Sequence, residues 1–427
     1  MTALNELSLH EAAALTVTRQ VKAEELVEAC IARIEAREPT VKAFEVFDPD
    51  HARDQAKALD AGPVRGPLHG IPLGVKDIID TADMATGWGS PIYAGHRPVR
   101  DAACVALCRA AGAVILGKTV TTEFAYFHPG KTVNPHNPAH TPGGSSMGSA
   151  AAVGDFMVPV AFGSQTAGSV IRPAAYCGTV GYKASHGDFS LDGVCGLSSS
   201  LDTLGCFVRD PHDLATMRAA LLGDPDAPAL SRPPRVGFYR TPHWDDAEPA
   251  TRALLDATAM LLSERGARVE DATLGPAFDR LSEAQKTVMA FETARTRAHE
   301  YEAHRDQVSP PMAKLIEVGR ATAYGAYREA RQLAAAGRRA LDELFGRFDL
   351  LLAPSAPGEA PEGLDATGDP LFNRMWTLLH VPCITLPIGA GPNGLPLGIQ
   401  LIGAKGEDGK LIAGAVWAWD RLGTPEP

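Results

Sequence analysis

The chain has 427 residues, of which 45% are apolar and 21% are charged, a composition typical of soluble globular proteins rather than disordered or fibrous ones. Its length allows one large α/β domain or roughly two or three average domains. Because the formal net charge is −11 and no cluster of Lys and Arg stands out, a nucleic-acid-binding surface is not expected.

Residues 1–6 contain neither a basic start nor an apolar run, and no later segment reaches the length of a membrane-spanning helix. We therefore expect a cytoplasmic protein without a membrane partner. The seven cysteines, from Cys30 to Cys383, lack the paired spacings of a disulfide framework or a zinc site. Cys104 and Cys108 lie four apart on a predicted helix without a nearby histidine, so we expect reduced thiols and no metal.

The first part of the chain, residues 1–60, is predicted to be helical. The segment Ser8–Glu11 has the spacing of a capping box, which marks the start of a helix. Further on, Val27, Ile31 and Ile34 recur at the period of a helix with one apolar face.

From Gly66 onward the pattern changes to short apolar runs separated by glycine loops and helical stretches. The runs 71–75 and 114–116 are examples, and they are typical of a sheet covered by helices. We interpret residues 61–210 as the core of an α/β fold. Within it, residues 130–205 are so dense in Gly, Ser and Thr that the chemistry is expected there.

The remaining chain is predicted to add helices and then strands. Residues 211–345 are interpreted as mostly helical, because the stretch from Glu283 to Phe345 is rich in Ala, Arg and Glu and poor in Gly. Residues 346–427 return to strand patterns that rejoin the earlier sheet. With no internal repeat, we interpret residues 1–427 as a single domain.

Two familiar motifs are rejected. Gly112–Thr119 matches the spacing of a phosphate-binding loop, but its middle residues have the composition of a buried strand where that motif needs a flexible loop. A Ser-His-acid triad is disfavoured because His128, His136 and His140 have no motif around them. Gly144–Gly148 also misses the register of the Gly-x-Ser-x-Gly elbow.

Lys76 is the first residue that points to chemistry. It ends the apolar run of a predicted strand, so burial is expected to lower its pKa and to make a neutral amine available as a base. Taken alone, a surface lysine at a strand end is the commoner explanation of this pattern.

Two segments rich in Gly and Ser follow. Gly143–Ser149 leads directly into the apolar helical stretch 150–153, which favours an ordered loop that caps a helix over a flexible linker. In Gly163–Ser169 small residues precede a serine, so the backbone amides of residues 166–169 can converge as an oxyanion hole.

Arg172 follows Ser169 by three residues. Its planar guanidinium has the geometry to hold a substrate carboxylate near the predicted nucleophile. An ion pair within the protein is an equally good interpretation of the same residue.

These segments resemble the amidase signature family. The likeness rests on Lys76, on Gly143–Ser149, on residues 163–181 with their ending from Arg172 to Gly181, and on residues 201–205. In the tail, residues 368–370, Asn373, Trp376, Thr377 and 394–396 are similar to those of malonamidases. The likeness therefore covers nearly the whole chain.

The resemblance implies a Ser-cisSer-Lys triad on a large mixed central sheet with helices on both faces. Matched position by position, Ser169 is the nucleophile, Ser145 is the proton relay with a cis peptide bond before it, and Lys76 is the base. The oxyanion N–H groups come from Thr166, Ala167 and Gly168. This scheme needs no metal and no organic cofactor, and the resemblance also suggests a homodimer.

Departures from the family pattern bear on the substrate. Met147 stands where the family usually has Gly or Ser, so an apolar side chain is expected to line or narrow the pocket. Ser164 replaces a more usual Thr, and Gln165 and Ala167 replace the Asp and Gly of many members, although Gln165 matches malonamidase-like members. The predicted substrate-binding residues are Arg172, Met147, Ser146 and Gln165.

The sequence thus predicts an amidohydrolase that cleaves the C–N bond of a small amide through an acyl-enzyme on Ser169. A malonamide-like acid held by Arg172 is the first candidate substrate, and carbamates and aryl amides are variants. The alternative is the glutaminase-like subunit of a tRNA-dependent amidotransferase complex.

Overall fold

The computed structural model describes residues 3–223 and 229–423, and within them a single sheet of 11 strands runs through the molecule. The strands are β1 (Phe44–Phe47), β2 (Pro72–Lys76), β3 (Val114–Thr119), β4 (Val160–Gln165), β5 (Val180–Lys183), β6 (Thr203–Val208), β7 (Arg235–Phe238), β8 (Arg268–Asp271), β9 (Leu350–Pro354), β10 (Cys383–Ala390) and β11 (Pro396–Ile402).

The order across the sheet is β1-β3-β2-β4-β6-β5-β10-β11-β9-β7-β8. The pairs β2·β3, β2·β4, β7·β8 and β7·β9 are parallel, and the other pairs are antiparallel. The predicted large mixed sheet is confirmed, and the tail strands β10 and β11 join it between β5 and β9.

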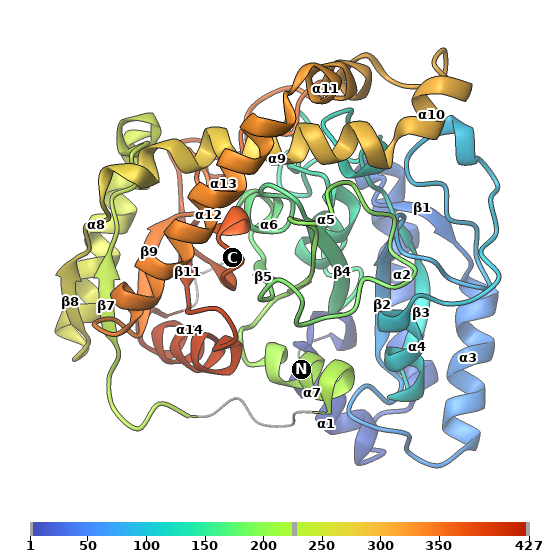
Figure 1. Ribbon diagram of the computed structural model, residues 1–427. Helices are drawn as coiled ribbons and strands as arrows, with labels where there is room; N and C mark the ends of the chain where they lie inside the picture. The colour runs from blue at the N-terminus through green and yellow to red at the C-terminus, as the bar shows by residue number, and fades with distance from the viewer. Residues whose placement is uncertain (1–2, 224–228, 424–427) are drawn as a thin grey trace.

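Helices lie on both faces of this sheet (Figure 1). They are α1 (Leu9–Val17), α2 (Ala23–Val41), α3 (Pro49–Ala61), α4 (Ala103–Ala110), α5 (Met147–Gly154), α6 (Ile171–Cys177), α7 (Asp213–Leu222), α8 (Pro249–Glu264), α9 (Leu281–Thr296), α10 (Ala298–Ala303), α11 (Pro310–Ala321), α12 (Tyr324–Phe345), α13 (Arg374–Leu378) and α14 (Asp408–Leu422).

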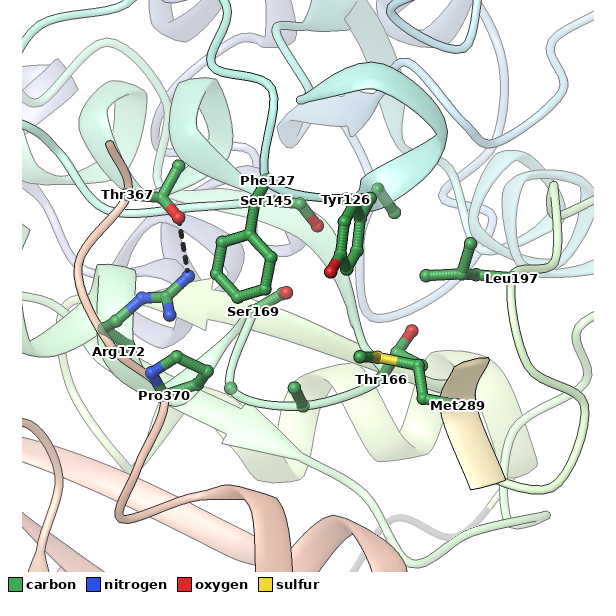
Figure 2. Close-up of a pocket in the computed structure, with 13 residues that line it drawn as sticks. Tyr126, Phe127, Ser145, Thr166, Ser169, Arg172, Leu197, Met289, Thr367 and Pro370 are labelled. Atoms are coloured by element: carbon green, nitrogen blue, oxygen red, sulfur yellow. Dashed lines mark hydrogen bonds between the residues drawn. The ribbon is translucent and has the colours of Figure 1, made fainter. Parts of the chain in front are cut away.

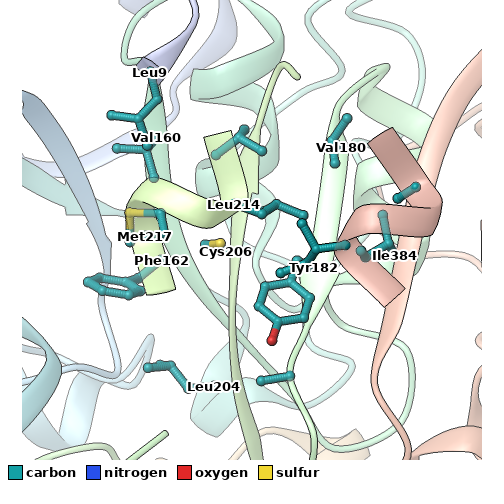
Figure 3. Packing of buried hydrophobic residues seen from close by; sticks show 14 of the residues in the cluster. Leu9, Val160, Phe162, Val180, Tyr182, Leu204, Cys206, Leu214, Met217 and Ile384 are labelled. Atoms are coloured by element: carbon teal, nitrogen blue, oxygen red, sulfur yellow. The ribbon is translucent and has the colours of Figure 1, made fainter. Parts of the chain in front are cut away.

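One face of the sheet packs against α1, α4, α7, α8 and α14. Figure 3 shows Leu9 of α1 and Leu214 and Met217 of α7 against strand side chains such as Phe162 and Tyr182, all of them buried. Alternate residues of β4, β5 and β6 point to this face, as expected for strands that are covered on both sides.

The opposite face is covered by two groups of helices. The apolar stretch of α5 and the residues of α6 pack with α2 on β3 and β4, whereas α9, α12 and α13 cover β9, β10 and β11. The loops that enter α5 and α6 lie on this face, and they carry the predicted catalytic serines.

Several local predictions are settled by these elements. The capping box at Ser8 is present, with Glu11 closing it. The segment Val114–Thr119 is a fully buried strand, which confirms that Gly112–Thr119 is no phosphate loop. Strand β1, however, interrupts the predicted helical stretch 1–60, because Phe44–Phe47 pairs with the edge of β3. No described helix is long and apolar enough to cross a membrane.

Candidate active site

Lys76 is the last residue of β2, which runs parallel to β4. The carboxyl ends of two neighbouring parallel strands meet at the same edge of a sheet, so Lys76 lies beside Ser164, near the end of β4. The loop before α5 crosses this edge, and its Gly144–Ser145 peptide bond is cis, as the resemblance implied. Only glycine fits at Gly144, because a Cβ there would lie 2.7 Å from a methyl carbon of Thr367.

The Lys76 amine is completely buried and is surrounded by hydroxyl groups. Its Nζ lies 2.7 Å from Ser145 Oγ, 3.0 Å from Ser146 Oγ and 3.0 Å from Ser164 Oγ. In the described part of the chain, no carboxylate forms an ion pair with it. Burial without such a partner lowers the pKa of Lys76 to about 7, although the charge of Asp202 opposes the shift.

The hydrogen bonds around Lys76 also limit which hydroxyl group can give it a proton. Ser146 donates its only hydroxyl proton to the Ser164 carbonyl at 3.3 Å, so it can only accept from the lysine. A neutral amine donates two hydrogen bonds and accepts one. Lys76 Nζ donates to Ser145 Oγ in the bond as it stands, and when the amine is neutral the same short contact allows the Ser145 hydroxyl to donate to the lysine lone pair instead.

Ser169 lies in the loop between β4 and α6 and lines a small cavity (Figure 2). The hydroxyl groups of Ser145 and Ser169 both face this cavity, beside the ring of Phe127. The cavity offers about 10 Å³ to the centre of a water-sized sphere, which is room for about one water molecule. Tyr126 and Phe127 form its aromatic wall.

The loop that leads to Ser169 turns its carbonyl groups away from the cavity. Gln285 Nε2 donates to Thr166 O at 2.9 Å, Thr377 Oγ1 donates to Ala167 O at 2.8 Å, and the amide of Arg172 donates to Gly168 O at 3.0 Å. In a trans peptide the next N–H points opposite to the carbonyl. The N–H groups of residues 167–169 thus point to the other side, and they donate no hydrogen bond within the described structure.

Gly168 is required for this arrangement, because a Cβ there would lie 2.4 Å from Asn373 Oδ1. Three free N–H donors beside a serine hydroxyl have the geometry of an oxyanion hole. Ala167 and Gly168 are among the predicted donors, whereas these contacts orient the N–H of Ser169 rather than that of the predicted Thr166.

Asp202 holds the same loop from a second direction. Its Oδ1 accepts from Thr166 Oγ1 at 2.6 Å, and its Oδ2 accepts from the amides of Leu197 and Ser198. Burial raises the pKa of this carboxyl to about 6, against the hydrogen bonds that stabilise its ionised form. The sequence motif contained Asp202 but gave no sign of this supporting contact.

Arg172 lines the cavity, as predicted, but its donors are largely used within the protein. They reach Gly144 O at 2.5 Å, Gly368 O at 2.9 Å and Thr367 Oγ1 at 3.2 Å, and the last contact is drawn in Figure 2. No described carboxylate pairs with it, so the alternative of a structural ion pair is wrong. Burial lowers the pKa of Arg172 to about 10, so it stays charged at neutral pH.

Three residues predicted to contact substrate lie elsewhere. Met147 does not line the cavity, because α5 starts at this residue and directs its sulfur to the amide of Gly130 at 3.2 Å. Gln165 is fully buried, and its amide group bonds Thr377 and the amides that open α6. Ser146 faces Lys76. None of the three lines the cavity, and each contacts residues that support it.

The family model described as Amidase matches residues 25–412 of the chain. The chain belongs to the amidase family. This amidase is a hydrolase that acts on C–N bonds, and it has the cis peptide bond and the large mixed sheet described above.

Related amidase-family proteins match over almost their full length. The chain is 35% identical to the putative amidase AmiD of Mycobacterium bovis, over 96% of this chain and 93% of that protein. It is 32% identical to a glutamyl-tRNA(Gln) amidotransferase subunit of Lachnospira eligens, over 94% of this chain and 95% of that protein. A solved structure described as an amidase superposes with a TM-score of 0.89 at 30% identity, covering 98% of this chain and 100% of that one. None of these three is named a malonamidase, so that finer resemblance stays a prediction.

Proposed function

We propose that this amidase hydrolyses the C–N bond of small carboxylic amides through an acyl-enzyme on Ser169. The observation that carries the proposal is the buried amine of Lys76, which lies 2.7 Å from Ser145 Oγ and has no carboxylate partner among the described residues. Such an amine is neutral in a large fraction of molecules near pH 7, since burial lowers its pKa to about 7.

In the proposed reaction Lys76 takes the proton of Ser145, and Ser145 takes that of Ser169 as Ser169 Oγ attacks the substrate carbonyl carbon. The negative charge on the carbonyl oxygen is stabilised by the N–H groups of Ala167, Gly168 and Ser169. The proton returns along the same path to the leaving nitrogen, and the C–N bond breaks. Water then attacks the ester on Ser169 and releases the acid.

We further propose that the acyl part of the substrate carries a carboxylate. Arg172 brings a charged guanidinium to the cavity wall, and no described carboxylate forms a close ion pair with it, although the charge of Asp369 acts on it from farther away. A negatively charged substrate group would supply a close counter-ion in a water-poor site. Aryl amides and carbamates are the variants to test beside acidic amides, because aromatic and apolar side chains also line the cavity: Tyr126, Leu197, Met289, and Phe127 next to Arg172.

Substituting Arg172 by methionine is expected to change selectivity between two substrates with the same skeleton. The ratio of kcat/KM for malonamate, which is ionised, to that for neutral malonamide should fall about 10- to 100-fold, the value of a lost charge-assisted hydrogen bond. Steady-state kinetics of ammonia release on both compounds measures this ratio.

Arg209→Met is the matched control. Arg209 is a half-buried arginine that also donates to backbone carbonyls, such as Val158 O at 2.8 Å, but it lies away from the cavity. It should leave the ratio unchanged. Equal losses on both substrates in Arg172→Met would contradict the carboxylate proposal and leave Arg172 as a support for Gly144 and Gly368.

A second candidate function follows from the near full-length match to a subunit of an amidotransferase. In that case the isolated chain would hydrolyse glutamine in preference to malonamate, aryl amides and carbamates. An ammonia-release assay over this panel, with glutamine included, separates the two functions. A homodimer and a cytoplasmic place of action stay predictions from the sequence.

A further inference from the structure

Two side chains outside the triad hold the carbonyl groups of the loop that leads to Ser169. They come from helices far along the sequence, α9 and α13, which pack against each other near α6 (Figure 1). Gln285 of α9 bonds Thr166 O, and Thr377 of α13 bonds Ala167 O.

The amide orientation of Gln285 is determined by its second contact. Arg374 donates from Nη1 to Gln285 Oε1 at 2.9 Å, so the oxygen of that side chain must face Arg374. The Nε2 group then has to face Thr166 O. Arg374 is buried and has no ion pair with any residue that the structure describes, so its hydrogen bond to Gln285 is not in competition with a carboxylate.

The hydroxyl group of Thr377 is oriented in the same way. Gln165 Oε1 accepts from the amides of Val170 and Ile171, which leaves Gln165 Nε2 to donate to Thr377 Oγ1 at 3.0 Å. Thr377 Oγ1 therefore accepts this bond, and its own proton goes to Ala167 O at 2.8 Å. The carbonyl of Asn373 is farther away, at 3.3 Å.

We propose that Gln285 and Thr377 are positioning residues of the oxyanion hole. By fixing the carbonyl groups of Thr166 and Ala167 on the outer side, they aim the N–H groups of Ala167 and Gly168 at the cavity. A hydrogen-bonded carbonyl also polarises its peptide and makes the following N–H a stronger donor. Neither side chain lines the cavity, so each acts through the backbone.

The inference rests on the proposed nucleophile, and it is tested with a monoalkyl fluorophosphonate. This probe phosphonylates an active serine, releases fluoride and places a phosphonyl oxygen in the oxyanion hole, whatever the natural substrate is. Thr377→Val and Gln285→Met should each slow modification of Ser169 by about 10- to 100-fold, below the full effect of deleting a donor. The midpoint of the pH dependence should not move, because the contacts of Lys76 stay intact.

Thr377→Ser keeps the hydroxyl group and should restore the rate. Thr16→Val is the matched control, since Thr16 is a buried threonine of α1 that donates to a backbone carbonyl at 3.1 Å, remote from the cavity. Thermal unfolding of all variants compares their stabilities.

Modification of Thr377→Val at the wild-type rate would overturn this inference but would leave the proposed function standing. So would an equal slowing in Thr16→Val, because the loss would then follow stability rather than position. Failure of the wild-type protein to be modified at Ser169 would instead overturn the proposed function.

Discussion

Ser169→Ala is expected to lower kcat on the best amide substrate by about 10⁴- to 10⁶-fold, the loss typical of deleting the nucleophile of a catalytic triad. The variant should still bind substrate, because the cavity keeps Arg172 and the free N–H groups of the loop. Progress curves at saturating substrate, with ammonia detection, measure the residual rate.

Ser282→Ala is the control for this prediction. Ser282 is another buried serine, at the start of α9, and its hydroxyl contacts His243 away from the cavity. It should keep a rate close to that of the wild-type protein. A Ser169→Ala enzyme with more than about one hundredth of the wild-type kcat would rule out the covalent route on this residue.

The second large effect concerns the base. The wild-type rate should rise with pH and level off above a midpoint of about 7, because only the neutral form of Lys76 accepts a proton. Lys76→Met should lower kcat about 10²- to 10⁴-fold and remove this rise. A wild-type rate that is constant from acidic to alkaline pH would exclude Lys76 as the titrating base.

Lys76→Met should also change the pH dependence of stability. Measuring the stability of this variant separates a loss of activity from unfolding. The folded-state pKa of Lys76 is about 7, below its unfolded value of 10.5, so between these values the unfolded chain binds a proton that the folded chain lacks. Wild-type stability should therefore rise with pH through this window, relative to Lys76→Met. In urea unfolding, the free energy of unfolding of Lys76→Met minus that of the wild type should be larger at pH 6 than at pH 9.

Much of the site could be predicted because its residues stand in local segments that resemble the amidase signature, which gave Lys76 and Ser145 their roles. Lys76 ends an apolar run, and Ser145 and Ser169 lie in segments whose glycines are needed for close packing. Short apolar runs after Gly66 and in the tail predicted a sheet covered by helices, and the resemblance implied that this sheet is large and mixed. The edge strand β1 was missed, since four residues between helices leave a weak pattern.

Side-chain directions could not be predicted in the same way. Met147 was expected in the pocket, but its direction depends on where α5 begins and how that helix is rotated. Gln165 was predicted to bind substrate because it replaces the Asp of many family members and matches malonamidase-like members. Its amide is instead consumed by backbone groups of its own chain.

Contacts between distant segments were beyond the reach of the sequence. Gln285 is one polar residue in a long helix, more than a hundred positions from Thr166, and its spacing carries no signal. Thr377 was part of the malonamidase-like tail, yet only the packing of α13 on α9 shows which backbone group it holds.

The covalent intermediate gives the most direct test of this mechanism. The enzyme is mixed with an aryl amide, or with the aryl ester of the corresponding carboxylic acid. The reaction is stopped at low pH during turnover, and the modified residue is located by peptide mass spectrometry with fragmentation. The proposed function predicts a mass increase equal to the acyl group on Ser169, and none in Ser169→Ala. An acyl group on Ser145 instead, or turnover with no acylated serine, would contradict it.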